Sequence, residues 1–274
     1  MKIINLIEDT KGAEGLCFEH GLSFYVETEN HRLLLDTGAS GDFILNAQKL
    51  GIDLTKVDTL LLSHGHYDHT GGVMRFAEIN PCAEIYLHEN AGGEYFNDYN
   101  SQRKYIGIDK NILALPQLVL TEGNMKIDDE LFLFSDIDCV TPIPSGNAIL
   151  KKEQDGILVQ DDFAHEQYLV IKSCGKTALL SGCAHRGIRN ILQSFKKIFD
   201  TYPDYVVSGF HMMKKTPYDK ADKALAEETA KALLATGAEF FSGHCTGDEA
   251  MEILLPILGD KLHVICSGDE IINI

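Results

Sequence analysis

Short apolar runs alternate with longer amphipathic stretches along this chain, and the alternation predicts strands interleaved with helices. Runs that are rich in β-branched and aromatic residues and bounded by polar turns are typical of strands. In the first half of the sequence, such runs cover 3–7, 22–28, 32–36, 57–63 and 84–87. Farther along the chain, they cover 117–120, 131–134, 168–171, 177–181, 205–207, 239–242, 262–266 and 270–272.

Amphipathic segments between these runs predict helices over 42–50, 73–77, 187–199 and 220–236, and from about residue 248. Asp42, near the start of the first segment, and Gly51, just after its end, are typical boundary signals of a helix. Each β-rich half is followed by helices, which favours two sheets packed face to face with helices outside. We therefore predict an α/β fold, a four-layer αββα sandwich, formed by a single domain over residues 1–274.

Two stretches depart from this alternation and are expected to be variable insertions. Residues at about 90–117 are polar, rich in Gly and Tyr and only weakly periodic, which indicates an insertion or a lid rather than core. The second stretch covers about 140–167, and its polar part at 151–167 predicts a mobile loop. The sequence has neither internal repeats nor low-complexity tracts.

Composition narrows the class of partner. The chain has 24 Lys and Arg residues against 41 Asp and Glu residues, a formal net charge of −17. Such an acidic balance argues against the clustered cations that bind nucleic-acid phosphates or an anionic membrane surface. The 45% of hydrophobic and 24% of charged residues are usual for globular proteins and exclude wholesale disorder. We therefore expect a small-molecule partner, with neither nucleic acid nor membrane.

Targeting segments and structural disulfides are not expected. The apolar stretch at 3–7 runs straight into Glu8 and Asp9, so it is too short for the apolar region of a secretory signal. Later apolar runs are far shorter than the ~18 residues that span a bilayer. The seven cysteines have no regular spacing and their number is odd, so they predict no disulfide framework. A reducing cytoplasm is the expected setting.

The strongest chemical signal is the segment SHGHYDHTGG at 63–72, directly after an apolar run. His64 and His66 are two residues apart, so on an extended strand end they project to the same side. Asp68 and His69 follow on the turn beyond and point to a neighbouring position. Imidazole and carboxylate groups at this spacing predict two metal ions, one held by imidazoles and the other by a mixed set.

The same segment carries a resemblance to a known family. Its pattern H-x-H-x-D-H resembles the signature of the metallo-β-lactamase-fold superfamily, whose members have the αββα sandwich. The phrases LLLDTG at 33–38, GCAH at 182–185 and GHCTG at 243–247 are similar to further motifs of that family, so the resemblance runs from about residue 20 to 265. Together with EHGLSFYVET, LLSGCAHRGIRNIL and SGFHM, they resemble a subfamily of metal-dependent hydrolases that includes an archaeal dihydropterin–ribofuranosylaminobenzene phosphate synthase.

The resemblance implies a ligand set. The first metal would be bound by His64, His66 and His185, and the second by Asp68, His69 and His244. Zinc is the expected ion at both positions, with iron or manganese as alternatives. Cys183 occupies the position where the superfamily commonly has a bridging Asp, and it is either a thiolate ligand or a small buried residue. His165 is an alternative to His185.

Other residues receive roles around this ligand set. Asp36 is expected to orient a ligand histidine or the metal-bound water by accepting a hydrogen bond. Asp68 would also orient the nucleophile, and His211 would serve as a substrate-contacting acid or base, as a replacement ligand, or as a structural residue. Arg186 and Arg189 stand beside a predicted helix start at Gly187 and would bind an anionic substrate, unless they are simply solvated. The expectation for His20, His31, His88 and His263 is an ordinary structural role, with the alternative for His20 and His88 that the strands they border face the same loops.

Three functions are compatible with these residues. The first is a metal-dependent hydrolase, in which two divalent ions supply hydroxide at neutral pH to a small phosphorylated or ester substrate. The second, implied by the resemblance, is a transferase that condenses a dihydropterin diphosphate with an aminobenzene ribotide. The third is a metal-binding sensor without turnover. Neither a P-loop nor a serine nucleophile elbow competes with the metal site.

Overall fold

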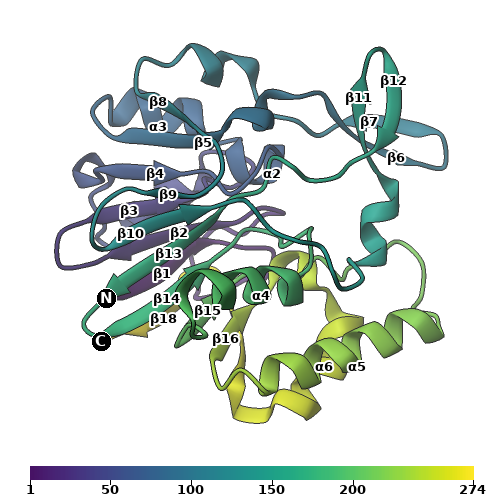
Figure 1. The fold of residues 1–274 in the computed structure, drawn as a ribbon. Helices are drawn as coiled ribbons and strands as arrows, with labels where there is room; N and C mark the ends of the chain where they lie inside the picture. Colours follow the sequence, from purple (N-terminus) through teal and green to yellow (C-terminus); the bar gives the residue numbers. More distant parts are fainter.

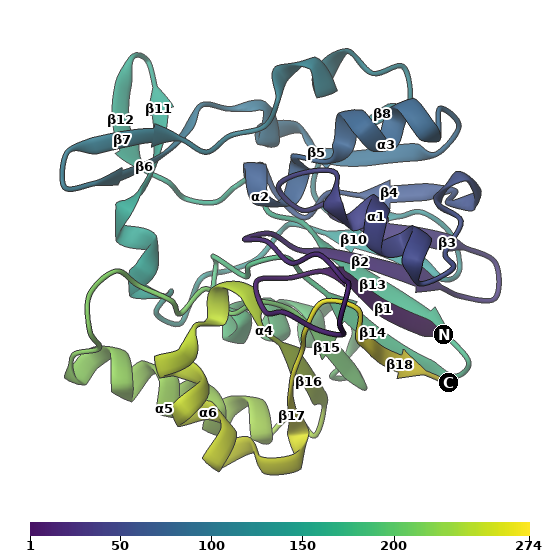
Figure 2. The same cartoon turned by 180° about the vertical axis from the view of Figure 1, so that it is seen from behind.

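Three stacked hydrophobic cores arrange the chain in four layers in the computed structural model, which describes residues 1–274 (Figure 1). The helices are α1 (Asp42–Lys49), α2 (Tyr67–Thr70), α3 (Val73–Ile79), α4 (Ile188–Phe199), α5 (Lys220–Leu234) and α6 (Asp248–Leu258). The order of the layers is α1 and α3, a first sheet, a second sheet, and α4 to α6 (Figure 2). The predicted αββα sandwich is therefore confirmed.

The first sheet has the strand order β18-β1-β2-β3-β4-β5-β8. Its strands are β1 (Lys2–Ile7), β2 (Ser23–Glu27), β3 (Arg32–Leu35), β4 (Thr59–Leu61), β5 (Glu84–His88), β8 (Leu118–Thr121) and β18 (Glu270–Asn273). The second sheet has the order β17-β16-β15-β14-β13-β10-β9. Its strands are β9 (Met125–Lys126), β10 (Leu131–Phe134), β13 (Tyr168–Ser173), β14 (Lys176–Leu180), β15 (Tyr205–Val207), β16 (Glu239–Ser242) and β17 (Leu262–Val264).

Alternation of side chains along the strands explains the layering. In the first sheet, one set of apolar residues, Phe24 and Leu33 among them, packs against the second sheet. The opposite set packs under α1 and α3, where Phe43 and Phe76 are fully buried. The second sheet repeats this arrangement, and its outer face is covered by α4, α5 and α6. Burial on both faces accounts for the continuous apolar runs from which the sequence predicts these strands.

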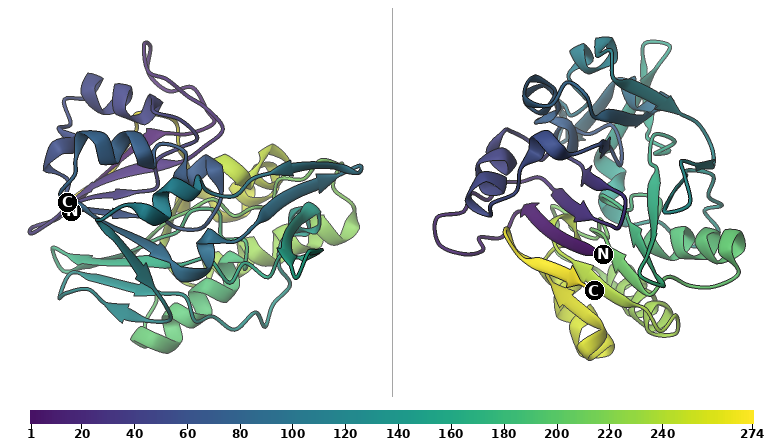
Figure 3. Two further views of the ribbon diagram at one scale, coloured as in Figure 1. Left: turned by 90° about the horizontal axis from the view of Figure 1, so that it is seen from above. Right: turned by 90° about the vertical axis from the view of Figure 1, so that its left-hand side faces the viewer.

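The two stretches expected to be insertions pair with each other to form a third sheet. Its order is β12-β11-β6-β7, with β6 (Tyr95–Tyr99), β7 (Gln102–Tyr105), β11 (Leu150–Gln154) and β12 (Ile157–Gln160). We call these four strands the lid sheet. It projects from the end of the sandwich opposite the chain termini (Figure 3).

The expectation of a loop over 151–167 is wrong. The first part of this stretch lies in the β11–β12 hairpin, and the second part is buried, with Phe163 and His165 both at 0% exposure. Phe163 packs with Tyr95, Ile106 and Leu150 in a small separate core beneath the lid sheet. The polar, exposed outer face of the hairpin hides its strand periodicity in the sequence.

The parallel parts of both sheets bring strand ends to one edge. Strands β3, β4 and β5 run parallel in the first sheet, and β14 to β17 run parallel in the second. The carboxyl ends of such strands are where α/β folds place their ligands. Gly182, just after β14, allows the two edges to meet, because a Cβ there would lie 2.2 Å from Oγ of Ser63 after β4. None of the helices is long and apolar enough to cross a membrane.

His31 joins the two sheets at the surface and gives the fold a dependence on pH. Its Nδ1 lies 3.0 Å from Oδ1 of Asp58, and its Nε2 lies 2.6 Å from Oδ2 of Asp128. Partial burial lowers the pKa of His31, but the hydrogen bonds with Asp58 and then Asp128 outweigh it and raise the pKa above 6.5. The stabilisation is therefore fully present below the unfolded-state pKa and is lost as pH rises through the raised folded-state pKa.

We expect His31→Gln to lower the free energy of unfolding by about 0.5–1 kcal/mol at acid pH, because the ion pairs are partly exposed. Urea unfolding at pH 5.5 and 8.5 measures this difference, which should shrink as the pH rises. A difference that grows with pH would contradict the assignment.

Candidate metal centre

Residues that follow five strand ends converge at this edge of the sandwich. Asp36 follows β3, His64 and His66 follow β4, and the segments after β14, β15 and β16 add His185, His211 and His244. Four residues near the edge have left-handed backbone conformations without being glycine: Asp36, Ala184, His211 and His244, with φ between 47° and 60°. Such strain is tolerated where the surroundings fix the chain, and it is common at functional sites.

The first group consists of three imidazoles whose ring nitrogens face one another. Nε2 of His64 lies 3.0 Å from Nδ1 of His66 and 3.3 Å from Nε2 of His185. All three rings are buried. Burial first and then the neighbouring imidazoles lower the pKa of each, to about 3 for His66. The three rings are therefore neutral at pH 7, which is the form that binds a metal ion.

The hydrogen bonds on the outer side of these rings fix their tautomers. The hydroxyl of Ser63 donates to Asp36 over 2.7 Å, so its oxygen accepts from Nδ1–H of His64 at 2.9 Å. On His185, Nδ1–H donates to Oδ1 of Asn147 over 3.0 Å. Both Nε2 atoms consequently carry a lone pair and no proton, although they lie 3.3 Å apart. A cation between them would satisfy both lone pairs, so these residues fit a metal ion.

The second group combines Asp68, His69, Cys183 and His244, whose ligand atoms all lie within 4.8 Å of one another. Oδ2 of Asp68 is 3.6 Å from Nε2 of His69 and 3.5 Å from Nε2 of His244. Nδ1–H of His69 donates to Asp36 over 2.6 Å, and Nδ1–H of His244 donates to Asp9 over 2.6 Å. The Nε2 of His244 is buried without a hydrogen-bond partner, so this group also fits a cation.

Cys183 lies where the two groups meet. Its Sγ is 3.1 Å from Nε2 of His69, and it also falls within 4.8 Å of the ligand atoms of His64 and His185. Burial raises the pKa of this thiol. A bound divalent cation favours the thiolate, so a sulfur shared by both groups fits a soft or borderline metal.

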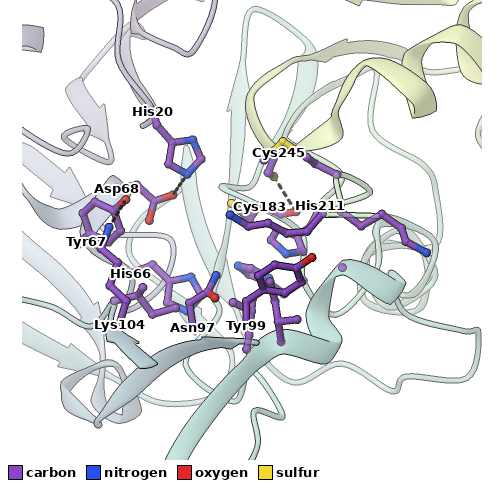
Figure 4. A pocket seen from close by; sticks show the side chains of 18 of the residues that line it. His20, His66, Tyr67, Asp68, Asn97, Tyr99, Lys104, Cys183, His211 and Cys245 are labelled. Carbon is purple, nitrogen blue, oxygen red and sulfur yellow. Dashed lines mark hydrogen bonds and ion pairs between the residues drawn. The ribbon is translucent and has the colours of Figure 1, made fainter. Parts of the chain in front are cut away.

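Four members of the two groups, His66, Asp68, Cys183 and His185, line the floor of a cavity of about 650 Å³. Figure 4 shows Asp68 and His66 on one side of it, with Cys183, His211 and Cys245 on the other. Its outer wall is formed by β6 and β7 of the lid sheet and by the loop that contains Met213. A volume of this size is usual for small-molecule sites.

A family model described as the metallo-beta-lactamase superfamily matches residues 18–195, well over half of the chain. The chain belongs to the metallo-β-lactamase superfamily. The resemblance inferred from the sequence is thereby confirmed.

Two proteins of this superfamily match the chain over almost its whole length. The 7,8-dihydropterin-6-methyl-4-(β-D-ribofuranosyl)-aminobenzene-5′-phosphate synthase of Methanocaldococcus jannaschii is 30% identical over 93% of this chain and 90% of its own. A crystal structure described as a metal-dependent hydrolase of the β-lactamase superfamily is also 30% identical, with a TM-score of 0.85 over 100% of this chain and 99% of its own. The Zn²⁺-bound PqqB of Methylobacterium extorquens shares the fold at 12% identity and a TM-score of 0.57, over 100% of both chains.

The structure does not bring Arg186 and Arg189 into the cavity of this superfamily member, although the sequence suggests them as substrate ligands. The guanidinium of Arg186 donates to the carbonyl oxygens of Ser135 and Ile137 at 3.0 and 2.7 Å. Arg189 forms an ion pair with Glu228 at 3.3 Å. Both cations therefore hold neighbouring segments together. Neither lines the cavity, contrary to the expectation that they contact the substrate.

Two residues beside the second group, Asp9 and His20, are not assigned to the site by the sequence. Oδ2 of Asp9 lies 2.8 Å from Nδ1 of His20, and its Oδ1 accepts from His244. Nε2 of His20 is 3.6 Å from Oδ2 of Asp68, and its ring stacks on that of His244. His20 therefore lines the cavity instead of being an ordinary surface residue. The signal that could have located this pair is Asp9, because this acidic residue follows β1, and β1 ends at the same edge of the sandwich as the metal-ligand candidates.

His165 lies behind the first group and does not replace His185. Its Nδ1 accepts from the backbone N–H of Gly65 at 3.0 Å, and its Nε2 donates to Asp161 over 3.2 Å. Both ring nitrogens are therefore engaged within the protein. His88 is also away from the cavity, where its Nδ1 accepts from the backbone N–H of Asn90.

Proposed function

We propose that this protein is a metal-dependent synthase of the dihydropterin type, which joins a dihydropterin diphosphate to an aminobenzene ribotide. The observation that carries the proposal is a cavity of about 650 Å³ with metal-ligand groups as its floor and a separate polar wall above them. That volume accommodates two small ring systems side by side. The full-length relation to the Methanocaldococcus jannaschii synthase supports the same function.

The reaction forms a bond from the aminobenzene partner to the methylene carbon of the dihydropterin. The carbon–oxygen bond to diphosphate breaks, its electron pair leaves with the diphosphate, and the aminobenzene partner loses a proton. His211 is suited to receive that proton, because it lines the cavity and its Nδ1 is without a partner. Its ring centroid is 3.9 Å from that of His185, so it faces the metal-ligand floor.

Two divalent ions, with zinc as the proposed identity, would be held by His64, His66 and His185 and by Asp68, His69 and His244, with Cys183 between the sets. When bound, such ions supply positive charge that polarises a substrate oxygen and offsets the charge that develops on a leaving group. Asp68 then has two tasks: it contributes a ligand oxygen, and it orients the reacting group beside His20. Strands β6 and β7 of the lid sheet line the cavity, and exclusion of water by this wall when substrates are bound would favour transfer over hydrolysis.

Hydrolysis of a small phosphorylated or ester substrate is the second candidate function. The observation in its favour is the equal, 30% identity to the structure described as a metal-dependent hydrolase, which has the same fold over its whole length. The same floor would serve it, with water in place of the aminobenzene partner.

We expect the metal-loaded protein to release diphosphate only when dihydropterin diphosphate and aminobenzene ribotide are supplied together. Diphosphate release and the mass of the condensed product measure this outcome. Diphosphate or phosphate released from either substrate alone would favour the hydrolase instead. Binding of two metal equivalents without turnover on any of these substrates would leave a metal-binding sensor, and the synthase proposal would then be wrong.

A further inference from the structure

We infer that Lys104 and Lys215 form an anion subsite at the mouth of the cavity, which binds the phosphate or diphosphate group of a substrate. The inference rests on the proposed function, because it assigns residues to the anionic part of the proposed substrates. Both lysines line the cavity, and both are exposed at its outer wall, whereas the metal-ligand groups are buried at its floor.

The charge at this mouth contrasts with that of the whole chain. Despite 41 acidic residues, the only one that lines the cavity is Asp68, which belongs to the second group. Neither Lys104 nor Lys215 forms an ion pair. Lys214 also lines the cavity, but its ammonium is engaged by Asp222. Arg103 lines the cavity as well and forms no ion pair, so these cations attract an anion to this point of an otherwise strongly acidic protein.

Each of the two lysines is held against an aromatic ring instead of a carboxylate. Nζ of Lys104 lies 4.6 Å from the centroid of the Tyr67 ring and 3.4 Å from its hydroxyl oxygen. Nζ of Lys215 lies 5.7 Å from the centroid of the Tyr99 ring. Cation–π contacts of this kind position an ammonium without neutralising its charge. Both charges therefore remain available to a ligand.

The two lysines come from different segments that both line the cavity. Lys104 is on β7, directly opposite Asn97 of β6, and both line the cavity. Lys215 is on the loop after β15 and reaches Tyr99 of β6. Arg103, the neighbour of Lys104, also lines the cavity, and its guanidinium lies 5.6 Å from the centroid of the Phe96 ring. Figure 4 shows Asn97, Tyr99 and Lys104 along one wall.

Two ammonium groups and a side-chain amide that line one cavity suit an anion with several oxygen acceptors. Lysine binds phosphates as a point charge with three donors, and Asn97 contributes a side-chain amide. A phosphate or a diphosphate fits this donor set, whereas a neutral ester does not use it. The subsite would hold the anionic group at the mouth, while the rest of the substrate extends toward the metal-ligand floor.

Isothermal titration of inorganic pyrophosphate into the metal-loaded full-length protein tests the subsite, with inorganic phosphate as a second probe. We expect Lys104→Ala/Lys215→Ala to raise the dissociation constant for pyrophosphate at least about tenfold. The reason is that each substitution removes a charge-assisted hydrogen bond, which contributes more binding free energy than a neutral one. The salt dependence of binding should also become shallower in this variant. Its metal content should match that of the unmodified protein, because neither lysine is a ligand.

Lys151→Ala/Lys172→Ala is the matched control, because it removes the same charge outside the cavity, partly from the lid sheet. We expect this control to bind pyrophosphate as the unmodified protein does. Equal affinity in the Lys104→Ala/Lys215→Ala variant, or an equal loss in the control, would overturn the inference.

The proposed subsite and the proposed reaction can be rejected independently of each other. Pyrophosphate binding that depends on the two lysines, without any condensation of the dihydropterin and aminobenzene substrates, would retain the subsite and reject the synthase. Condensation whose KM is unchanged by Lys104→Ala/Lys215→Ala would retain the synthase and reject the subsite.

Discussion

His66→Ala is expected to abolish turnover and to remove about one equivalent of bound divalent metal, because the proposed first metal position would be held by three neutral imidazoles and two would not suffice. Loss of activity should exceed about 100-fold, the upper range for substitutions that only perturb residues around a metal ligand. Elemental analysis after purification without added metal, together with the diphosphate-release assay, measures both effects. A fully metallated and active His66→Ala protein would refute the assignment.

His31→Gln is the control for this experiment, because its imidazole lies on the surface, away from the cavity. It should retain the full metal content and the full activity. A circular dichroism spectrum of His66→Ala that matches the unmodified protein excludes unfolding as the cause of metal loss. The His66 ring makes its closest contact with the other metal-ligand imidazoles, so its removal leaves the two sheets intact.

Asp36→Ala is expected to have the largest effect on stability. The carboxylate of Asp36 is fully buried and accepts hydrogen bonds from the backbone N–H and hydroxyl of Ser63, each at 2.7 Å, and from Nδ1–H of His69 at 2.6 Å. Its removal leaves buried donors unsatisfied, so the free energy of unfolding should fall by about 3–5 kcal/mol. Urea unfolding at pH 7 measures the loss.

Two further variants sharpen this experiment. Asp36→Asn keeps one oxygen acceptor and tolerates the left-handed backbone at this position, so it should cost less than Asp36→Ala. Asp53→Ala removes an exposed helix-capping carboxylate and should cost no more than about 1 kcal/mol. If Asp36→Ala were no more harmful than Asp53→Ala, Asp36 would not organise the site.

The elements of the sandwich and the centre of the site were predictable because their signals are local. The strands β10, β15 and β16 match the predicted ranges residue for residue. The segment 63–72 concentrates four of the metal-ligand candidates in one turn, and the strand-end positions of His185 and His244 follow the same logic. Apolar periodicity and ligand spacing both operate within a few residues, so a single sequence reveals them.

The lid sheet and the anion subsite were not predictable in this way, because they depend on contacts between distant segments. The strand β7 reads Gln-Arg-Lys-Tyr, entirely exposed and without an apolar face, and it becomes a strand only through pairing with β6. The role of Arg186 depends on two carbonyl groups some fifty residues earlier in the chain. The approach of Lys215 to Tyr99 also spans the fold, and no local pattern encodes it.

The pairing register of the lid sheet has a consequence for how relatives of this protein diverge. Asn97 and Tyr99 line the cavity, while the alternate residues of β6, Phe96 and Asp98, do not. Because side chains alternate along a strand, a shift of one residue would exchange the two sets. Insertion of a single residue before Phe96 would then give the wall an apolar ring and a carboxylate in place of an amide and a phenol. Relatives could change ligand in one genetic step, with every residue of the metal centre unaltered.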